Sequence, residues 1–249
     1  MNLRAFLFAA VASLAAVNAD VNMINHDQVK AFAQPEPTTD SEKSAVKFKP
    51  QLHISYGCHP YPAVQADGSV SAGLKWAGPA DGKCKGFGLG SQVYSRSGWY
   101  KDRWAIMYAW YFPKGRQYIT KYRSGHRHYW SYAIVWTDNP NPDNSTILGV
   151  SMSAGVGFRK ASPPKSKFVI DGTTVKFDSY RSFWGSKQGV RLTTKSGDTQ
   201  DLITWEQLTE EARIGLSDAD LDVYWSMRKV VMPLADDVFM EKLKNAYPF

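Results

Sequence analysis

The residue types best suited to chemistry lie in one short segment of the chain. His126 and His128 flank Arg127 and precede an aromatic stretch. Imidazoles in this pattern could bind a metal ion, act as a general base or make structural hydrogen bonds, and the residue types alone leave all three open. No Asp or Glu occurs between Asp102 and Asp138, and no nucleophile elbow is present. The segment therefore lacks the carboxylate pair of a glycosidase and the activated serine of a hydrolase.

The elements that must position these histidines have the patterns of β-strands. Residues 104–112 are apolar on both faces, as in a strand that is covered on both sides. Residues 129–137 place an aromatic or aliphatic side chain at every second position, and residues 147–158 alternate large apolar residues with small ones. The pair Asp171-Gly172 between two short strand patterns predicts a hairpin.

Helical patterns appear only late in the chain. They cover residues 202–213, with Thr204 as a candidate N-cap, and residues 236–246. Many short strands followed by a few helices predict a mostly β fold, an antiparallel β-sandwich with a few peripheral helices.

The N-terminus has the features of an export signal. Arg4 precedes an apolar run from Ala5 to Val17, and Val17-Asn18-Ala19 ends it with small residues. The run is too short for a transmembrane helix, which needs about 20 apolar residues. We predict a signal peptide over residues 1–19, a flexible polar lead-in over residues 20–45 and one secreted domain over residues 46–249.

Cysteine content and charge agree with export. In an oxidising compartment the only two cysteines, Cys58 and Cys84, are expected to form a disulfide. Asn144 begins the only N-glycosylation sequon, directly after a turn-rich stretch that should expose it. The chain has a formal net charge of +7. Such a charge suits an acidic polysaccharide or an anionic membrane surface, and export argues against nucleic acid as a partner.

Two motifs resemble those of the necrosis- and ethylene-inducing peptide-like proteins, which plant-associated oomycetes, fungi and bacteria secrete. The stretch AIMYAWYFPKG resembles the undecapeptide of that family and consists of Ala105, Ile106, Met107, Tyr108, Ala109, Trp110, Tyr111, Phe112, Pro113, Lys114 and Gly115. The stretch GHRHYWS resembles its heptapeptide, usually GHRHDWE, and consists of Gly125, His126, Arg127, His128, Tyr129, Trp130 and Ser131. The resemblance extends from about Ser44 to Phe249. It implies an oomycete member with a β-sandwich similar to that of actinoporin toxins.

In cytolytic members of the family, carboxylates of both motifs hold a divalent cation of the calcium or magnesium class. Here Gly115, Tyr129 and Ser131 stand where the family has Asp, Asp and Glu. Hard cations of this class prefer charged oxygen ligands, which these three residues do not supply. Nearby cations oppose a metal ion further; they are Lys114, Arg116, Lys121, Arg123 and Arg127. The departures predict that the family's cation site is lost, and that the protein uses no metal or other cofactor.

The resemblance then implies two functions. The first is a non-cytolytic effector of a plant pathogen, secreted into the host apoplast, whose undecapeptide a plant cell-surface receptor detects as a microbial pattern. The alternative is a cytolysin that binds glycosyl inositol phosphoryl ceramides of the plant plasma membrane, with the basic cluster holding the anionic headgroups. In either case we expect a monomer without enzymatic activity.

Overall fold

The computed structural model describes residues 21–86, 88–118, 123–155, 157–182, 188–219, 221 and 230–249. The predicted signal peptide, residues 1–19, lies outside these ranges. Within the described residues, no helix is long and apolar enough to cross a bilayer.

Most of the regular structure is β-sheet. The strands are β1 (Met23–Ile24), β2 (Gln51–Ile54), β3 (Val70–Ser71), β4 (Gln92–Tyr100), β5 (Arg103–Tyr118), β6 (Arg123–Thr137), β7 (Ile147–Ala154), β8 (Gly157–Ala161), β9 (Val169–Ile170), β10 (Thr174–Arg181), β11 (Gln188–Leu192) and β12 (Asp201–Thr204). The helices are α1 (Asp40–Lys47), α2 (Glu210–Asp218) and α3 (Asp236–Ala246), and a 3-10 turn covers Ser166–Phe168.

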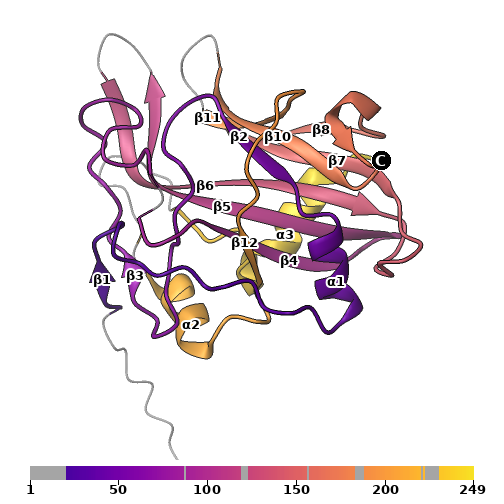
Figure 1. Ribbon diagram of the computed structural model, residues 1–249, viewed down its shortest axis with the longest axis horizontal. Coiled ribbons are helices and arrows are strands. Elements are labelled where there is room, and N and C mark those ends of the chain that lie inside the picture. Colours follow the sequence, from indigo (N-terminus) through magenta and orange to yellow (C-terminus); the bar gives the residue numbers. More distant parts are fainter. Residues whose placement is uncertain are drawn as a thin grey trace, which may run out of the picture.

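One large curled sheet forms the body of the protein. Its strand order is β12-β4-β5-β6-β7-β11-β10-β2, with β8 paired to β7 and β9 to β10, and Figure 1 shows α1 in front of this sheet and α3 behind it. Trp110 of β5 and Phe177 of β10 are far apart in the strand order, yet their ring centroids are 6.3 Å apart. The two halves of the sheet therefore face each other, and the predicted mostly β sandwich is confirmed. Its ends differ from a purely antiparallel sheet, because β12 pairs with β4 and β2 with β10 in parallel.

The central strand β5 is covered on both faces, as its sequence predicts. On one face the Tyr108 hydroxyl donates a hydrogen bond of 2.8 Å to the Ala45 carbonyl oxygen of α1. On the other face the Tyr111 hydroxyl lies 3.1 Å from Ser71 Oγ of β3. Every residue from Ala105 to Gly115 is buried as a result.

Two elements differ from the sequence prediction. The strand predicted over residues 147–158 ends at Ala154, and the chain reverses at Gly155 (φ +63°) into β8, which pairs back onto β7. The helix predicted over residues 202–213 begins later, at Glu210, where the Thr209 side chain accepts from the Ala212 amide. Its first part is β12, because pairing with β4 buries two aliphatic side chains there and outweighs helix propensity.

The N-terminal lead-in also differs from expectation. Instead of a flexible segment over residues 20–45, the structure shows residues 21–45 held against the domain. The Val29 side chain is fully buried, and the Phe32 amide donates a 2.7 Å bond to Gln92 Oε1. Helix α1 begins with a capping box between Thr39 and Glu42. Composition misled here because a few buried apolar side chains and hydrogen bonds to distant residues are enough to fix this polar segment.

The predicted disulfide between Cys58 and Cys84 is confirmed. Closing a loop with a sequence separation of 26 residues should stabilise the fold by about 3 kcal/mol in the chain-entropy treatment. Asn144 is exposed in the connection between β6 and β7, and its glycosylation stays a prediction.

Candidate functional site

The two motifs meet side by side in the sheet. The undecapeptide lies within β5 and the heptapeptide within β6, and the antiparallel register pairs Gly115 with His126 and Phe112 with Tyr129. Ser131 lies two residues after Tyr129, opposite Trp110, and therefore on the same face of β6. The structure thus brings together Gly115, His126 and Tyr129, with Ser131 deeper along the strand.

The His126 ring fills the space above Gly115. A Cβ atom built on Gly115 would lie 2.8 Å from His126 Cε1, closer than real contacts allow, and 3.0 Å from Tyr129 Cβ, which is a tight contact. The ring is held by its Nδ1 atom, which lies 3.0 Å from the Arg127 carbonyl oxygen and 2.7 Å from that of His128. Because both partners are acceptors, Nδ1 carries the proton. Glycine at 115 is what allows this placement.

Tyr129 is tied down by its hydroxyl, which donates a 2.8 Å hydrogen bond to the Gln188 carbonyl oxygen of β11. Its ring lies beside those of Phe112 and His126, with centroids 5.9 Å away in each case. Burial raises the pKa of the Tyr129 phenol to about 12. The group is therefore a neutral phenol at physiological pH.

These donors do not fit a calcium or magnesium ion. The residues at the meeting point offer an imidazole, a neutral phenol and a serine hydroxyl, whereas hard cations bind charged or carbonyl oxygens. Among the residues that the structure describes, no group of three His, Cys, Asp or Glu side chains is placed to hold a metal ion.

The close fit at Gly115 leads to a stability prediction. Gly115→Ala should lower the free energy of unfolding by about 1–3 kcal/mol, because the new methyl group must displace the His126 ring from its two hydrogen bonds. Gly157→Ala is the matched control, since a Cβ there meets nothing within 4 Å. Urea unfolding of both variants measures the difference. Equal stabilities of the two variants would contradict the described packing.

His128 has a structural role. It lies opposite Pro113 with φ 52°, its side chain is 3% exposed, and its Nδ1 atom is 2.7 Å from the Tyr111 hydroxyl. Gly73 approaches the ring so closely that a Cβ there would lie 2.8 Å from Cε1. Burial, together with the neighbouring Arg127 and His126, lowers the pKa of His128 to about 4. Of the three roles that the sequence left open, this neutral, enclosed imidazole fits the structural one.

The predicted basic cluster is only partly available at the surface. Lys114 is 2% exposed, and its Nζ atom donates to the carbonyl oxygens of Pro79 (3.0 Å) and Gly82 (2.8 Å), inside the loop that the disulfide closes. Arg127 is partly exposed and donates to the Ala72 carbonyl oxygen at 3.2 Å. The side chains of the other three members lie outside the described part of the structure; these are Arg116, Lys121 and Arg123. Lys114 therefore belongs to the interior, contrary to its grouping with surface cations.

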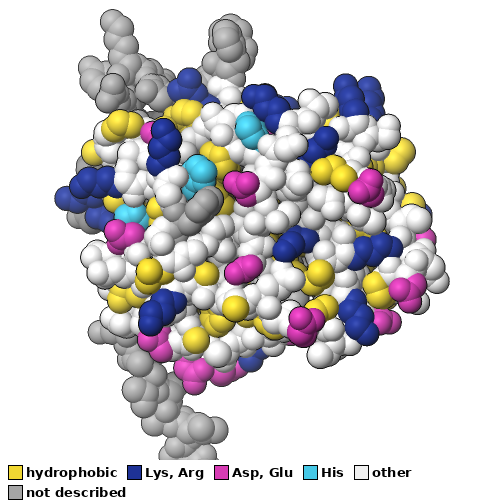
Figure 2. Space-filling model, in the orientation of Figure 1, with side chains coloured by type: hydrophobic (Ala, Val, Ile, Leu, Met, Phe, Trp, Pro, Cys, Tyr) yellow, Lys and Arg dark blue, Asp and Glu magenta, His cyan; other side chains and the backbone are white. Residues whose placement is uncertain are grey.

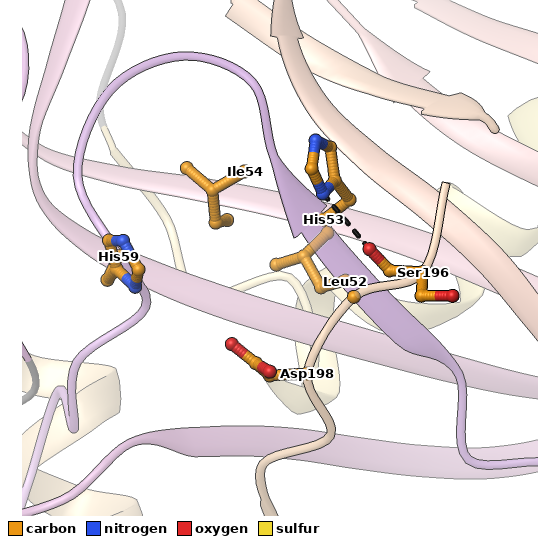
Figure 3. Close-up of a pocket in the computed structure, with 7 residues that line it drawn as sticks. Leu52, His53, Ile54, His59, Ser196 and Asp198 are labelled. Atoms are coloured by element: carbon orange, nitrogen blue, oxygen red, sulfur yellow. Dashed lines mark hydrogen bonds between the residues drawn. The ribbon is translucent and has the colours of Figure 1, made fainter. Parts of the chain in front are cut away.

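A polar cavity that the sequence did not indicate lies away from the motifs. It has a volume of about 340 Å³ and lies between β2, the disulfide loop and residues 196–198. Figure 3 shows His53 and His59 on different sides of it, with Leu52 and Ile54 between them. His53 Nδ1 lies 3.1 Å from the Ser196 carbonyl oxygen. Burial lowers the pKa of His59, while Asp198 and Asp81 act in the opposite direction. The long sequence separation of these residues left no local pattern to detect.

Comparison with known proteins gives consistent matches along the chain. The model of the family described as necrosis inducing protein (NPP1) matches residues 42–246. The chain is 61% identical over 251 residues to NLP effector protein Pc118548 of Phytophthora capsici, covering 100% of both chains. It is 54% identical over 220 residues to the necrosis-inducing protein NPP1 of Phytophthora cinnamomi, covering 88% of this chain and 85% of that one.

Solved structures share the fold. A crystal structure of the non-toxic HaNLP3 protein superposes with a TM-score of 0.82 at 42% identity, covering 90% of this chain and 99% of that one. A structure of NLPPya in complex with mannosamine superposes with a TM-score of 0.79 at 40% identity, again covering 90% and 99%.

Proposed function

Because the chain belongs to the necrosis-inducing protein (NPP1) family, we propose that it is a secreted effector that plant immunity detects and that does not lyse plant membranes. One observation carries the proposal. At the meeting point of the two motifs, Gly115, Tyr129 and Ser131 replace the acids that the resemblance leads us to expect, and the rings of His126 and Tyr129 fill the space. Without charged oxygen ligands, these motif residues offer a divalent cation no site from which it could bridge to a headgroup.

The similarity to a protein described as non-toxic supports this reading. Our chain combines the same fold with a motif pair whose cation-binding side chains are absent. The protein then acts through recognition in the host apoplast rather than through catalysis, and it does so as a monomer.

Detection by a receptor depends on the undecapeptide, which retains its apolar and aromatic side chains. In the folded protein, however, all residues from Ala105 to Gly115 are buried, and Tyr108, Trp110 and Tyr111 hydrogen-bond inward. A receptor cannot contact these side chains in the native sheet. The pattern therefore has to be released by unfolding or proteolysis before a cell-surface receptor can bind it.

The direct test is infiltration of purified mature protein into leaves of a susceptible broad-leaved plant. We expect no necrosis and no dye release from vesicles made of leaf plasma membrane, because the cation bridge is absent. The necrosis-inducing protein NPP1 of Phytophthora cinnamomi, infiltrated into the same leaves, serves as the positive control for necrosis. Prompt cell death or dye release from the vesicles would contradict the proposal.

A specific observation keeps the cytolysin alternative testable. The related NLPPya has been solved in complex with mannosamine and with glucosamine, so a similar fold binds sugars. Headgroup binding by the basic cluster needs no metal ion, so the vesicle assay above tests it. A cytolysin that binds glycolipids through a metal ion should instead show a higher melting temperature in millimolar calcium. We expect no shift with calcium, and a clear upward shift would favour the cytolysin.

A further inference from the structure

The positive charge of the protein is concentrated in residues 157–195. This segment holds nine Lys and Arg residues and two Asp residues, and its excess of positive charge is as large as the formal net charge of +7 of all 249 residues. The rest of the chain therefore has equal numbers of basic and acidic residues. The nine residues are Arg159, Lys160, Lys165, Lys167, Lys176, Arg181, Lys187, Arg191 and Lys195.

The described part of this segment forms β8, β9, β10 and β11, and Figure 2 shows Lys and Arg side chains gathered over this end of the sheet. On β10, Lys176 and Tyr180 share one face, since they are four residues apart in a strand. Arg159 of β8 and Arg191 of β11 lie over the Tyr180 ring, with guanidinium carbons 5.3 Å and 4.4 Å from its centroid. Lys176 Nζ also donates to the Thr194 carbonyl oxygen at 3.3 Å, which places the Lys195 loop next to it.

We call Arg159, Lys176, Tyr180, Arg191 and Lys195 the basic face. Its two arginines come from different strands and are held in place. Each stacks on the same tyrosine ring, which reduces the side-chain entropy that a ligand would have to restrict. The basic face is therefore pre-organised at its centre.

Among the ion pairs of the described residues, one involves the basic face, and its acid is buried. Asp178, 1% exposed, accepts from Arg191 Nε at 2.9 Å and pairs with the other end of that guanidinium at 2.8 Å. None of the ion pairs in the described ranges involves Arg159, Lys176 or Lys195. These three cations, together with the exposed half of Arg191, give the basic face a net positive field.

We propose that the basic face binds a carboxylated polysaccharide, a linear polyuronate. Guanidinium groups are planar forks that match carboxylates, and several cations spread over neighbouring strands match a chain that repeats its negative charge. The proposal rests on the secretion proposed above, because only an exported protein meets such polymers. It does not depend on immune detection or on lysis, which concern the motif strands β5 and β6.

An anionic bilayer fits the basic face less well. Binding at a membrane interface combines cations with apolar side chains that enter the headgroup region. In the described part of the chain, the large exposed hydrophobic residues all lie outside residues 157–195; they are Met23, Trp76, Leu89, Trp99, Ile214, Val231, Met240 and Phe249. Within the described residues, the basic face therefore offers charge without a large exposed hydrophobic side chain beside it, which suits a soluble or wall-bound polyanion.

The experiment measures binding of the mature protein to polygalacturonate by calorimetry or co-sedimentation. The test variant is Arg159→Gln/Lys176→Gln/Lys195→Gln, which spares Arg191 and so keeps the buried Asp178 paired. Three exposed lysines elsewhere provide the matched control, Lys43→Gln/Lys85→Gln/Lys244→Gln, with the same change in net charge. Melting temperatures of both variants confirm that they are folded.

We expect the wild type and the control to bind polygalacturonate with a strength that falls as salt rises, and the test variant to bind about tenfold or more weakly. Binding to neutral mannan should be absent in all three. Equal loss in the test variant and the control would overturn the proposal, because it would show a general charge effect. Stronger binding to phosphatidylserine vesicles than to polygalacturonate would also overturn it, by assigning the face to membranes. The leaf assays for necrosis test the proposed function separately, and their result does not depend on whether the test variant binds polygalacturonate.

Discussion

A synthetic peptide of residues 105–128 should elicit ethylene production or an oxidative burst at concentrations at least about a hundredfold lower than the intact folded protein. The reason is the complete burial of Ala105 to Gly115 in the central strand β5. If exposure requires global opening, a typical unfolding free energy of about 5 kcal/mol or more leaves on the order of one molecule in a thousand or fewer open. Dose–response curves in a responsive plant, with protease inhibitors present, measure the ratio.

Breaking the disulfide should make the eliciting potency of the intact protein more similar to that of the peptide. Cys58→Ser/Cys84→Ser removes a constraint worth about 3 kcal/mol, which raises the open population by about two orders of magnitude. The same bridge closes the loop that holds Lys114, the penultimate residue of the undecapeptide. The variant should therefore be cleaved faster and elicit a stronger response. Equal potency of peptide and protease-protected native protein would show that the receptor reads the folded surface instead.

Lowering the pH from 7.5 to 4 should reduce the free energy of unfolding by about 3 kcal/mol through His128 alone. Its pKa is about 4 in the folded protein and 6.5 without burial, and a difference of one pKa unit corresponds to about 1.4 kcal/mol. At pH values between these two pKa values, His128 is protonated in the unfolded chain but not in the folded one. The protein therefore keeps its full free energy of unfolding, as far as His128 is concerned, above pH 6.5. This free energy falls as the pH drops from 6.5 to 4, and His128 lowers it no further below pH 4. Urea unfolding at a series of pH values measures the slope.

Two variants separate titration of His128 from its packing. His128→Asn removes the titrating ring but keeps a short polar side chain that tolerates the left-handed backbone at this position, so it should flatten the profile. Tyr111→Phe keeps the imidazole and removes its hydroxyl partner. It should lower stability by about 1–2 kcal/mol at every pH and leave the slope in place. Part of the slope that remains in His128→Asn is expected from His59, whose pKa burial also lowers. The rest is expected from carboxyl groups such as Asp67 and Asp102, whose pKa values hydrogen bonds lower. An unchanged slope in His128→Asn would show that His128 is not the main titrating group.

Strong local patterns were sufficient to predict the elements that carry the motifs. The run 104–112, which is apolar on both faces, is the centre of β5. The helix expected over residues 236–246 has those bounds. The hairpin at Asp171-Gly172 is present, with φ 50° and 72° at the two residues. In each case the signal lies within a few neighbouring residues, where backbone preference and burial agree.

Contacts between distant residues were beyond the reach of these patterns. Lys114 appeared to be a surface cation because its partners, Pro79 and Gly82, are more than 30 residues earlier in the chain. The sequence indicated the loss of acids at positions 115, 129 and 131, but not that the His126 ring would occupy the space above Gly115. The lead-in was misjudged for the same reason, since its anchors on Gln92 and β3 are remote.

The two parallel strand pairs at the ends of the sheet have a consequence for the order of folding. Strands β4 to β7 follow one another and pair with their neighbours, so they can assemble after short loop closures. By contrast, β12 must reach back from Asp201 to Gln92, and β2 must wait for Lys176 to be synthesised before it pairs with Gln51. Contacts of such high sequence separation form slowly, so we expect the meander of β4 to β7 to assemble first and the two end strands to close over it last. The undecapeptide would then already be paired in β5 while the chain is still incomplete.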